Sequence, residues 1–438
     1  MNDPENRMNV AVIGSGIAGL STSWLLGKKH KVTLYEKDSR LGGHSNTVEV
    51  SFGVKKINVD TGFIVFNNQN YPNLVALFDH LGVETTPSDM SFSASLGDGR
   101  LEYSGTNLRG LFGQPSNALK LSFWQMLYDL NRFYKSAPAD LKRGELKDLS
   151  LGDYLFKKSF SAAFIENHIL PMGAAIWSTT SQEMKNYPVE SFVRFFESHG
   201  LLQVTNRPEW RTVKNGSAQY VNKLIEDFSG TIRMVGVNAI ERSDNCVIVR
   251  EMGGDIKNYD QVVIATHADQ ALALLKDPGK DESAILGDWQ YTKNRAFLHS
   301  DPRFMPRRKH VWASWNFIQN MKNNSDTPLC VTYWMNSLQS LPEDHPLFVT
   351  LNPQQDRNPA DTHRIIDYEH PLYDRKALAS QNKLWSLQGI RRTWFCGSYF
   401  GYGFHEDGLQ SGLLVAEKLG GVKRPWDVPE KSSRIRVF

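Results

Sequence analysis

The sequence predicts an α/β protein in which a parallel-sheet domain is interrupted by an inserted α+β domain. Residues 10–36 have the pattern of strand, glycine-rich turn, helix and strand, which is typical of a βαβ unit. Short strand patterns return in residues 230–272, and again before a final helix in residues 392–421. The long segments between these pieces have other patterns, so we expect them to form a second domain.

A glycine-rich turn follows the first predicted strand. Gly14, Gly16 and Gly19 form G-x-G-x-x-G at the start of an apolar helix, and the next strand ends at Glu36. Glycines in such a turn let the backbone approach a pyrophosphate, and the helix N-terminus offers free N–H groups to it. An acid at the end of the second strand suits a pair of ribose hydroxyls. The order of these elements predicts a Rossmann-like dinucleotide site.

The residues after Glu36 decide between NAD and FAD. Arg40, Gly42 and Gly43 complete E-x-x-x-R-x-G-G, which resembles the extended fingerprint of FAD enzymes in the flavin amine oxidase superfamily. The two glycines bare the backbone beside the diphosphate and flavin, and Arg40 adds positive charge there. We expect the FAD to be non-covalent, because Cys396 lies in the last strand, too early in the chain to reach the flavin edge.

Composition narrows the classes of function. A net charge of +3 over 438 residues does not favour nucleic-acid binding. The three cysteines are far apart and show neither metal-ligand spacing nor a disulfide framework, so we expect a reducing compartment and no metal. The polar N-terminus has no signal-peptide pattern, and no apolar run is long enough to span a bilayer. These features predict a cytoplasmic protein, free or peripheral on the inner face of the membrane.

We expect a discontinuous FAD-binding domain and a discontinuous substrate domain. The FAD-binding domain comprises residues 1–70, 207–271 and 388–438, and the substrate domain comprises residues 71–206 and 272–387. The first insert is helical in character.

Apolar residues recur at helical spacing from Leu119 to Tyr134, with basic residues among the aromatic ones. This pattern predicts a core-facing helix, or alternatively a helix on a lipid interface or a lid over an apolar tunnel. In the second insert, "HVWASWNF" and "PLCVTYWM" alternate and predict strands of an antiparallel sheet.

The resemblance to flavin amine oxidases extends over nearly the whole chain. Asp60-Thr61-Gly62 matches the turn whose backbone meets the isoalloxazine, and "VGVNAI" matches the strand that receives the adenine. "VVIATHADQAL" resembles the family's V-x-A-x-P-x-x-x-A element with His267 in the proline place, and "GFHEDGLQSG" resembles its closing element. The resemblance implies an amine-oxidase-type fold, with a Rossmann-like FAD-binding domain and an inserted α+β substrate domain.

The expected cofactor-binding residues follow from the fingerprint and from this resemblance. They are Gly14, Ser15, Gly16, Ile17, Ala18, Gly19, Glu36, Lys37, Arg40, Gly42, Gly43, His44, Thr61, Gly62, Phe63, Val237, Ala265, Gly397, Glu406, Asp407, Gly408 and Leu409. Glu406 and Asp407 have a second interpretation as caps of the last helix.

More narrowly, the chain resembles a bacterial group of predicted NAD/FAD-binding amine-oxidase-like proteins. The segments "LPMGAAIWS", "LHSDPRFMPRR", "ASWNF", "VTYWMN" and "GYGFHEDG" carry this likeness. Related domains occur fused to cyclopropane-fatty-acid synthases. The functional analogues that this implies are flavin-dependent isomerases and desaturases of unsaturated fatty acids.

Two departures from the superfamily pattern bear on the chemistry. Gly397 is followed by Ser398 where an acid is usual, so we expect Glu406 to supply the ribityl contact. No lysine can be fixed beside flavin N5; Lys293 is a candidate, with a surface lysine as the alternative. The second position of the amine cage offers His405, which weakens a simple amine-oxidase interpretation.

Three functions stay open. The first is an FAD-dependent oxidoreductase, or a redox-neutral isomerase or desaturase, that acts on unsaturated fatty-acyl chains by hydride transfer to flavin N5. The second is an amine oxidase that releases hydrogen peroxide, and the third is a non-catalytic flavin-binding partner of a fatty-acid methyltransferase. No second G-x-G-x-x-G is present for NADPH.

The candidate catalytic residues are His405, Trp315 and Lys293. His405 would relay a proton or hydrogen-bond the flavin, with capping or packing of its loop as the alternative. Trp177, Trp315 and Trp334 are candidates for the substrate pocket, and core packing is the alternative for each.

Overall fold

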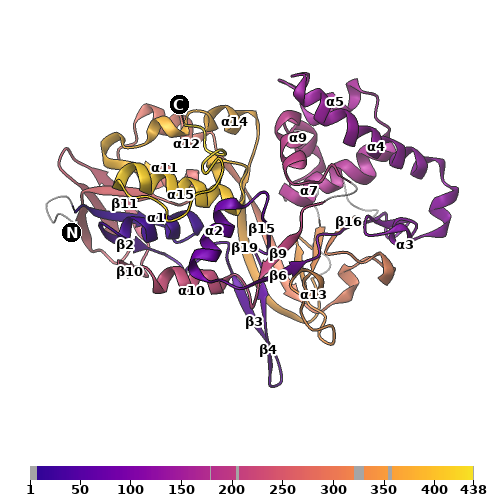
Figure 1. Cartoon of the computed structure of the whole chain (residues 1–438), viewed down its shortest axis with the longest axis horizontal. Coiled ribbons are helices and arrows are strands. Elements are labelled where there is room, and N and C mark those ends of the chain that lie inside the picture. Colours follow the sequence, from indigo (N-terminus) through magenta and orange to yellow (C-terminus); the bar gives the residue numbers. More distant parts are fainter. Residues whose placement is uncertain (1–6, 178, 204–206, 320–329, 354–357, 438) are drawn as a thin grey trace.

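A computed structural model describes residues 7–177, 179–203, 207–319, 330–353 and 358–437. Figure 1 shows an α/β part on one side, a helical part on the other, and the long strands β15 and β19 between them. The predicted α/β class is confirmed.

A parallel sheet forms the centre of the α/β part. Its strand order is β10-β2-β1-β14-β20, with every neighbouring pair parallel. The strands are β1 (Asn9–Ile13), β2 (Lys31–Tyr35), β10 (Thr231–Arg233), β14 (Gln261–Ile264) and β20 (Thr393–Phe395). Three separate stretches of sequence therefore assemble one sheet.

Helices α1 (Ile17–Gly27) and α15 (His405–Gly420) pack against each other beside this sheet (Figure 1). The start of α1 packs so closely on the turn before it that a Cβ on Gly19 would lie 1.9 Å from the carbonyl oxygen of Gly14. The antiparallel strands β11 (Val237–Arg242), β12 (Val247–Glu251) and β13 (Ile256–Tyr259) lie nearby, and the Tyr259 hydroxyl lies 2.7 Å from the Tyr35 hydroxyl.

A mixed sheet joins the two inserts. Its order is β19-β15-β18-β17-β16-β7-β8, and β7 pairs with β16 in parallel. The strands are β7 (Phe92–Leu96), β8 (Leu101–Ser104), β15 (Gln290–His299), β16 (Trp315–Gln319), β17 (Cys330–Trp334), β18 (Phe348–Leu351) and β19 (Thr362–Leu372).

Two details of this sheet differ from the expectation. The first insert is not helical throughout, because it contributes β7 and β8. The buried side chains of these two strands lie in a sheet whose other strands come from far along the chain. In "HVWASWNF" the strand begins at Trp315, because Lys309–Val311 forms a short 3-10 helix. Residues 328–329 of "PLCVTYWM" lie outside the described residues.

The helical part comes from the first insert. It comprises α3 (Leu108–Leu111), α4 (Leu121–Lys142), α5 (Leu151–Lys157), α6 (Ala162–Phe164), α7 (Leu170–Trp177), α8 (Ser181–Asn186) and α9 (Val189–Ser198). Helix α4 buries Phe123, Met126 and Phe133 at the predicted helical spacing and packs on α6 and α9. No helix in the described ranges is long and apolar enough to cross a bilayer.

Smaller elements connect these layers. They are β3 (Thr47–Phe52), β4 (Lys55–Asp60), β5 (Val65–Asn67), β6 (Thr85–Ser88), β9 (Trp210–Val213), α2 (Pro72–Leu81), α10 (Ala218–Glu226), α11 (Ala268–Leu274), α12 (Lys280–Gly287), α13 (Met335–Leu338) and α14 (Arg375–Gln381). Helix α2 packs on α15, although the expected domain boundary assigns α2 to the insert.

Candidate active site

A cavity of about 1810 Å³ runs from the β1–α1 turn to the helical part. One end is lined by the glycine turn, the end of β2 and the loop before β3. The other end is lined by α7, α9 and the mixed sheet. A cavity of this size has room for a dinucleotide and for a second ligand.

The glycine end is a cradle made of backbone. Helix α1 begins after Gly16 without a side-chain cap, and no atom lies within 4 Å of the position that a Cβ on Gly16 would take. Gly43, with φ +58, closes the other side, where a Cβ would lie 3.0 Å from the Gly16 Cα. Uncapped N–H groups beside open space match the requirements of a pyrophosphate.

Glu36 is fixed at the edge of this cradle. Its Oε2 accepts hydrogen bonds from the Ser15 N–H (3.0 Å) and the Ser15 hydroxyl (2.5 Å), and its Oε1 accepts one from the Asp38 N–H (2.9 Å). These bonds hold the carboxylate in one orientation while it lines the cavity. Each oxygen keeps acceptor capacity for a ribose hydroxyl.

Arg40 braces the second glycine segment. Its guanidinium donates to the carbonyl oxygens of Gly43 (2.6 Å) and Ser45 (3.3 Å), and the Gly42 N–H donates to the Ser15 carbonyl (3.0 Å). Arg40 therefore brings its charge to the cavity and also joins the loop to the first turn.

The histidines His44, His267 and His370 form a cluster beside this loop. The ring of His44 lies 5.4 Å from that of His370 and 6.5 Å from that of His267, and it stacks on Tyr368 at 5.0 Å. Burial, with a smaller contribution from neighbouring basic groups, lowers the pKa of His44 to about 4, that of His267 to about 4 and that of His370 to about 3. All three imidazoles are neutral at pH 7, and the buried Nε2 of His44 has no hydrogen-bond partner among the described residues.

His405 is the first residue of α15 and lines the cavity. Its Nε2 lies 2.7 Å from the Tyr220 hydroxyl and 3.3 Å from the Ser45 hydroxyl, and its ring stacks on Phe63 at 3.9 Å. Burial lowers the pKa of His405 to about 3, so the ring is neutral. His405 therefore packs its loop against Phe63, as the structural interpretation predicts, and it also presents a neutral imidazole to the cavity.

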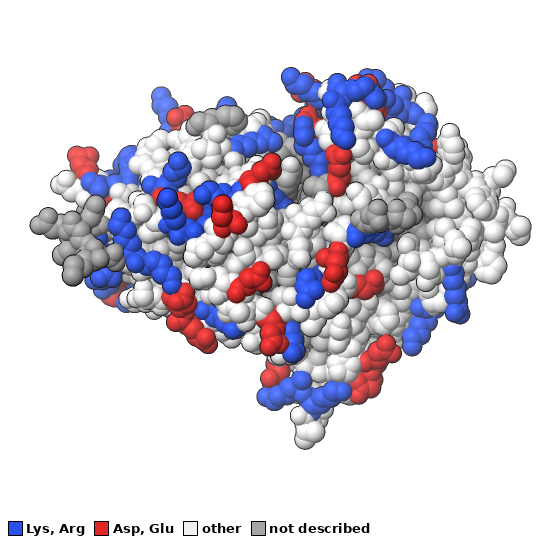
Figure 2. Space-filling view, in the orientation of Figure 1, with Lys and Arg blue, Asp and Glu red and all other residues white. Residues whose placement is uncertain are grey.

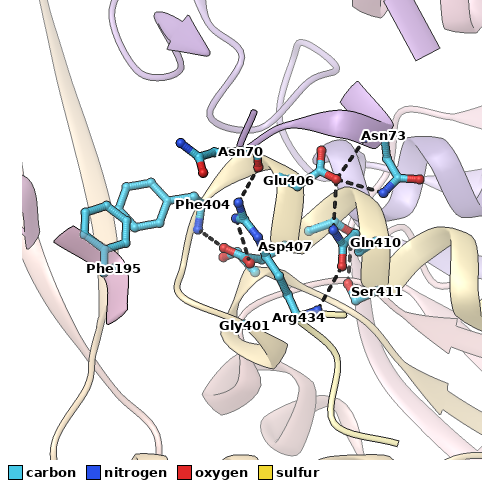
Figure 3. Close-up of polar contacts among 12 residues, drawn as sticks. Asn70, Asn73, Phe195, Gly401, Phe404, Glu406, Asp407, Gln410, Ser411 and Arg434 are labelled. Atoms are coloured by element: carbon cyan, nitrogen blue, oxygen red, sulfur yellow. Dashed lines mark hydrogen bonds and ion pairs between the residues drawn. The ribbon is translucent and has the colours of Figure 1, made fainter. Parts of the chain in front are cut away.

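Glu406 and Asp407 do not line the cavity, and both carboxylates make polar contacts within the fold (Figure 3). Glu406 accepts hydrogen bonds from the N–H groups of Asn73 (3.0 Å) and Leu74 (2.9 Å) and so caps α2. Asp407 accepts from the Phe404 N–H (2.8 Å) and caps α15. The expectation that the Glu406 carboxylate supplies the ribityl contact is therefore wrong, because that carboxylate is used within the fold.

The C-terminal segment closes this network. The Arg434 guanidinium lies 3.2 Å from Asp407 and also bonds the Asn70 carbonyl, while the Arg434 N–H donates to Gln410 (3.2 Å). Asp407 in turn holds Phe404, whose ring stacks on Phe195 of α9 at 4.7 Å (Figure 3). The helix α15 start is thus tied both to the chain end and to the helical part.

Most of the expected cofactor residues share the cavity lining. Those that line it are Gly14, Ser15, Gly16, Ile17, Ala18, Glu36, Lys37, Arg40, Gly43, His44, Thr61, Gly62, Phe63, Val237, Ala265, Gly397 and Gly408. Gly19, Gly42 and Leu409 lie behind the lining, as do Glu406 and Asp407.

The helical part supplies a different wall. The lining residues from the first insert are Tyr71, Met90, Ser91, Phe92, Met172, Ala175, Ile176, Trp177, Phe195, His199 and Leu201. None carries a charge at pH 7, because burial lowers the pKa of His199 to about 3. Trp315 adds to the lining from β16, whereas Trp334 lies outside it and packs on Trp312 at 5.5 Å.

Besides the charged residues of the cofactor end, the lining has charged residues on β15 and β19, which form its rim. Lys293 is exposed on β15 opposite Glu369, and Arg295 donates to Asp367 (2.8 Å). The environment of Lys293 is therefore that of a surface lysine, which was the alternative to a catalytic role.

A family model for flavin containing amine oxidoreductases matches residues 17–358. The chain belongs to this family. An L-amino-acid oxidase of Notechis scutatus scutatus is 46% identical over 48 residues, which span 11% of this chain and 9% of the relative.

Solved structures show the same fold over 94% of this chain. Putrescine oxidase with bound putrescine is 14% identical, with a TM-score of 0.64 over 99% of its chain. Cyclohexylamine oxidase from Brevibacterium oxydans IH-35A is 13% identical, with a TM-score of 0.65 over 99%. The CLA-producing fatty acid isomerase from P. acnes is 13% identical, with a TM-score of 0.65 over 98%.

The site of this amine oxidoreductase fits the flavin that its family implies. The glycine cradle, the oriented Glu36 and the unpartnered His44 Nε2 would hold the diphosphate, ribose and ring system. Motif analysis missed Phe195, Tyr220 and Tyr368, although the Tyr368 hydroxyl lies 2.8 Å from that of Thr61. Apolar helical spacing over Val189–Ser198 could have marked Phe195 as a packed residue, and no sequence signal marks Tyr220 or Tyr368.

Proposed function

We propose that this amine oxidoreductase binds non-covalent FAD and acts on unsaturated fatty-acyl chains, as an oxidoreductase, desaturase or redox-neutral isomerase. The observation that carries the proposal is the uncharged wall from the first insert. An apolar chain gains free energy in such a cavity, roughly 0.8 kcal/mol per buried CH₂ group, whereas an alkylammonium ion loses its hydration there.

The cysteines support the non-covalent form and a cytoplasmic setting. Cys396 is fully buried, does not line the cavity and lies 3.7 Å from the Thr22 hydroxyl. The wide spacing of Cys246, Cys330 and Cys396 along the chain supports the proposal of a reducing compartment.

A bound flavin would supply the hydride acceptor for a C–H bond of the substrate. The chain supplies the surroundings: Phe195 and Phe404 offer aromatic faces beside the positive charge that hydride removal leaves on an allylic carbon. The neutral His405 adds no charge that would repel this cation. Its Nε2, in contact with the Tyr220 hydroxyl, can hold or accept one proton.

An isomerase needs no further reactant, because the hydride returns to another carbon of the same chain and the double bond moves. A desaturase or oxidase would need an electron acceptor such as oxygen. The fold likeness to the CLA-producing fatty acid isomerase makes the redox-neutral variant a reasonable first test.

An amine oxidase that releases hydrogen peroxide is the second candidate. The family and the fold shared with putrescine oxidase and cyclohexylamine oxidase favour it. The third candidate is a flavin-binding partner of a fatty-acid methyltransferase that does not turn over itself.

Anaerobic mixing of the holoprotein separates the three candidates. Unsaturated fatty acids, a panel of amines and NADPH are added in turn while flavin absorbance is followed and lipids are analysed. We expect changed lipid and, at least transiently, a bleached flavin with the unsaturated acid alone. Peroxide formation from an amine in air, with unchanged lipid, would establish the second candidate instead, and inertness to every compound would favour the third.

His405→Ala sharpens this experiment. A desaturase loses a proton from the substrate after hydride removal, and loss of a positioned base lowers the rate of such a reaction about 10²–10⁴-fold. An isomerase returns the hydride and moves no proton, so its rate should change much less. FAD should stay bound in the variant, because Glu36 and the glycine cradle are intact. His345→Ala, which removes a histidine outside the cavity lining, serves as the matched control.

A further inference from the structure

An edge of the helical part exposes large apolar side chains. We define the α3–α4 rim by five residues with these exposed fractions: Leu108 76%, Leu119 88%, Leu121 87%, Trp124 49% and Tyr128 66%. Single exposed apolar residues are ordinary, but a group of this kind in one region marks a contact surface.

The rim is continuous through direct contacts. Leu121, Trp124 and Tyr128 follow each other at spacings of three and four on α4, so they share one face of the helix. The Trp124 ring lies 5.7 Å from that of Phe112, whose N–H donates to the Leu108 carbonyl one turn earlier (3.0 Å). The indole N–H of Trp124 also donates to the Ala118 carbonyl (2.8 Å), which fixes the ring in place.

The exposed charges around the rim are mostly basic. Between residues 103 and 144, the basic side chains that are exposed or half-buried are Arg109, Lys120, Arg132, Lys135, Lys142 and Arg143. The acids of the same stretch, Asp129 and Asp140, are buried and form ion pairs with Arg132 and with Arg143 and Lys158. The exposed acids that flank this stretch are Asp98, on the β7–β8 turn that Lys120 contacts through the Arg100 carbonyl, and Glu145, which pairs with Arg143. Figure 2 shows this region as a white edge with Lys and Arg beside it.

We propose that the α3–α4 rim docks on a lipid bilayer that contains anionic lipids. Exposed leucines beside Trp and Tyr suit the boundary between acyl chains and headgroups, and an excess of exposed basic residues suits an anionic surface. A protein partner would also cover apolar residues, but it would not by itself account for the excess of basic charge. The inner face of α4 packs on α9, which lines the cavity, so docking brings that wall close to the membrane.

Vesicle co-sedimentation of the holoprotein tests the proposal. We expect binding to phosphatidylcholine vesicles with 30% phosphatidylglycerol, weaker binding to pure phosphatidylcholine, and loss of the difference at high salt. The double variant L119S/L121S should lower the partition coefficient about tenfold or more, and R109Q/K135Q, which replaces two exposed basic residues, about fivefold or more.

A matched control is V54S, because Val54 is a fully exposed apolar residue at the distant β3–β4 turn. We expect vesicle binding of V54S to equal that of the unchanged protein. Flavin spectra and melting temperatures of all variants should be unchanged, since the replaced side chains are exposed.

Equal binding of L119S/L121S and the unchanged protein would overturn the proposal, as would no binding to anionic vesicles. Self-association that L119S/L121S abolishes, without vesicle binding, would assign the rim to a second copy of the chain. None of these results depends on the substrate, so the docking proposal and the proposed function fail separately.

Discussion

The two ends of the cavity are built in different ways. The cofactor end is a set of backbone turns, in which Gly16 and Gly43 leave space and Glu36 is fixed by its neighbours. The wall from the first insert is made of side chains, such as Met90, Ile176 and Phe195, that lie far apart in sequence. Backbone-built sites need particular residues at fixed spacing, whereas a side-chain wall needs only apolar bulk.

The largest effect is expected from Gly19→Ala. A Cβ there would lie 1.9 Å from the Gly14 carbonyl oxygen, and backbone cannot move aside as a flexible side chain can. We expect a loss of about 3 kcal/mol or more in the free energy of unfolding, or insoluble protein. Thermal and urea unfolding of the apoprotein measure it.

Gly16→Ala is the matched control for this variant. Gly16 has φ −64, and nothing lies within 4 Å of the added Cβ, so apoprotein stability should change by less than about 0.5 kcal/mol. Its methyl group would enter the cradle, and FAD affinity should fall at least about tenfold by titration. Equal destabilisation by both variants would mean that the turn serves the fold alone.

The contrast between the two ends explains what sequence could predict. The Gly14 turn, Glu36 and Gly43 could be expected to lie together because pyrophosphate chemistry fixes both residue type and spacing, and the structure places them in one cavity lining. Glu406 was misassigned because a carboxylate at a helix start caps backbone N–H groups as readily as it binds a hydroxyl, and only the packing of α2 against α15 decides between them.

Long-range pairing was also beyond the sequence. Strand β7 carries no signal that its parallel neighbour is β16, more than two hundred residues later. For the same reason Tyr368 could not be assigned to the turn at Thr61, which it reaches from β19. The helical period of α4, by contrast, is a local property and was predicted correctly.

Acid should destabilise the apoprotein, because three histidines that line the cavity are buried in the neutral form and must be protonated when the chain unfolds in acid. The pKa is about 4 for His44 and about 3 for His370 and His405 in the folded chain, against about 6.5 when unfolded. Between these values the unfolded chain binds more protons, so stability is present above about pH 6.5 and is lost as pH falls. At pH 5 this costs about 2 kcal/mol per histidine.

Asp60 acts in the opposite sense. Burial raises its pKa to about 6, so the folded chain takes up that proton first and gains about 1 kcal/mol at pH 5. Four groups therefore give a net loss of several kcal/mol, visible as a lower melting temperature at pH 5 than at pH 7.5. A His370→Gln variant should have a shallower pH dependence, and a melting temperature that rises on acidification would contradict this assignment.

A smaller effect is expected from Glu36→Gln. The amide keeps the shape of the carboxylate but loses charge-assisted bonds to ribose hydroxyls, worth about 1.5–3 kcal/mol. FAD affinity should fall about ten- to a hundredfold, as flavin fluorescence titration would show. The apoprotein should also lose about 1–3 kcal/mol of stability, because the amide NH2 would face the backbone N–H of Ser15 or Asp38 that the carboxylate now accepts from. Unchanged affinity would leave Glu36 as a brace for the Ser15 turn only.

The smallest effect is expected from Lys293→Met. The side chain is exposed on β15 opposite Glu369, at the rim and not against the apolar wall. If the substrate is an uncharged chain held by that wall, the rate constant for flavin reduction should change less than about twofold, since isolated surface charges contribute little. The measurement is stopped-flow reduction with an unsaturated fatty acid and, separately, with an amine. A large loss confined to the amine would restore Lys293 as a catalytic residue and would move the reaction from the aromatic wall to the charged rim.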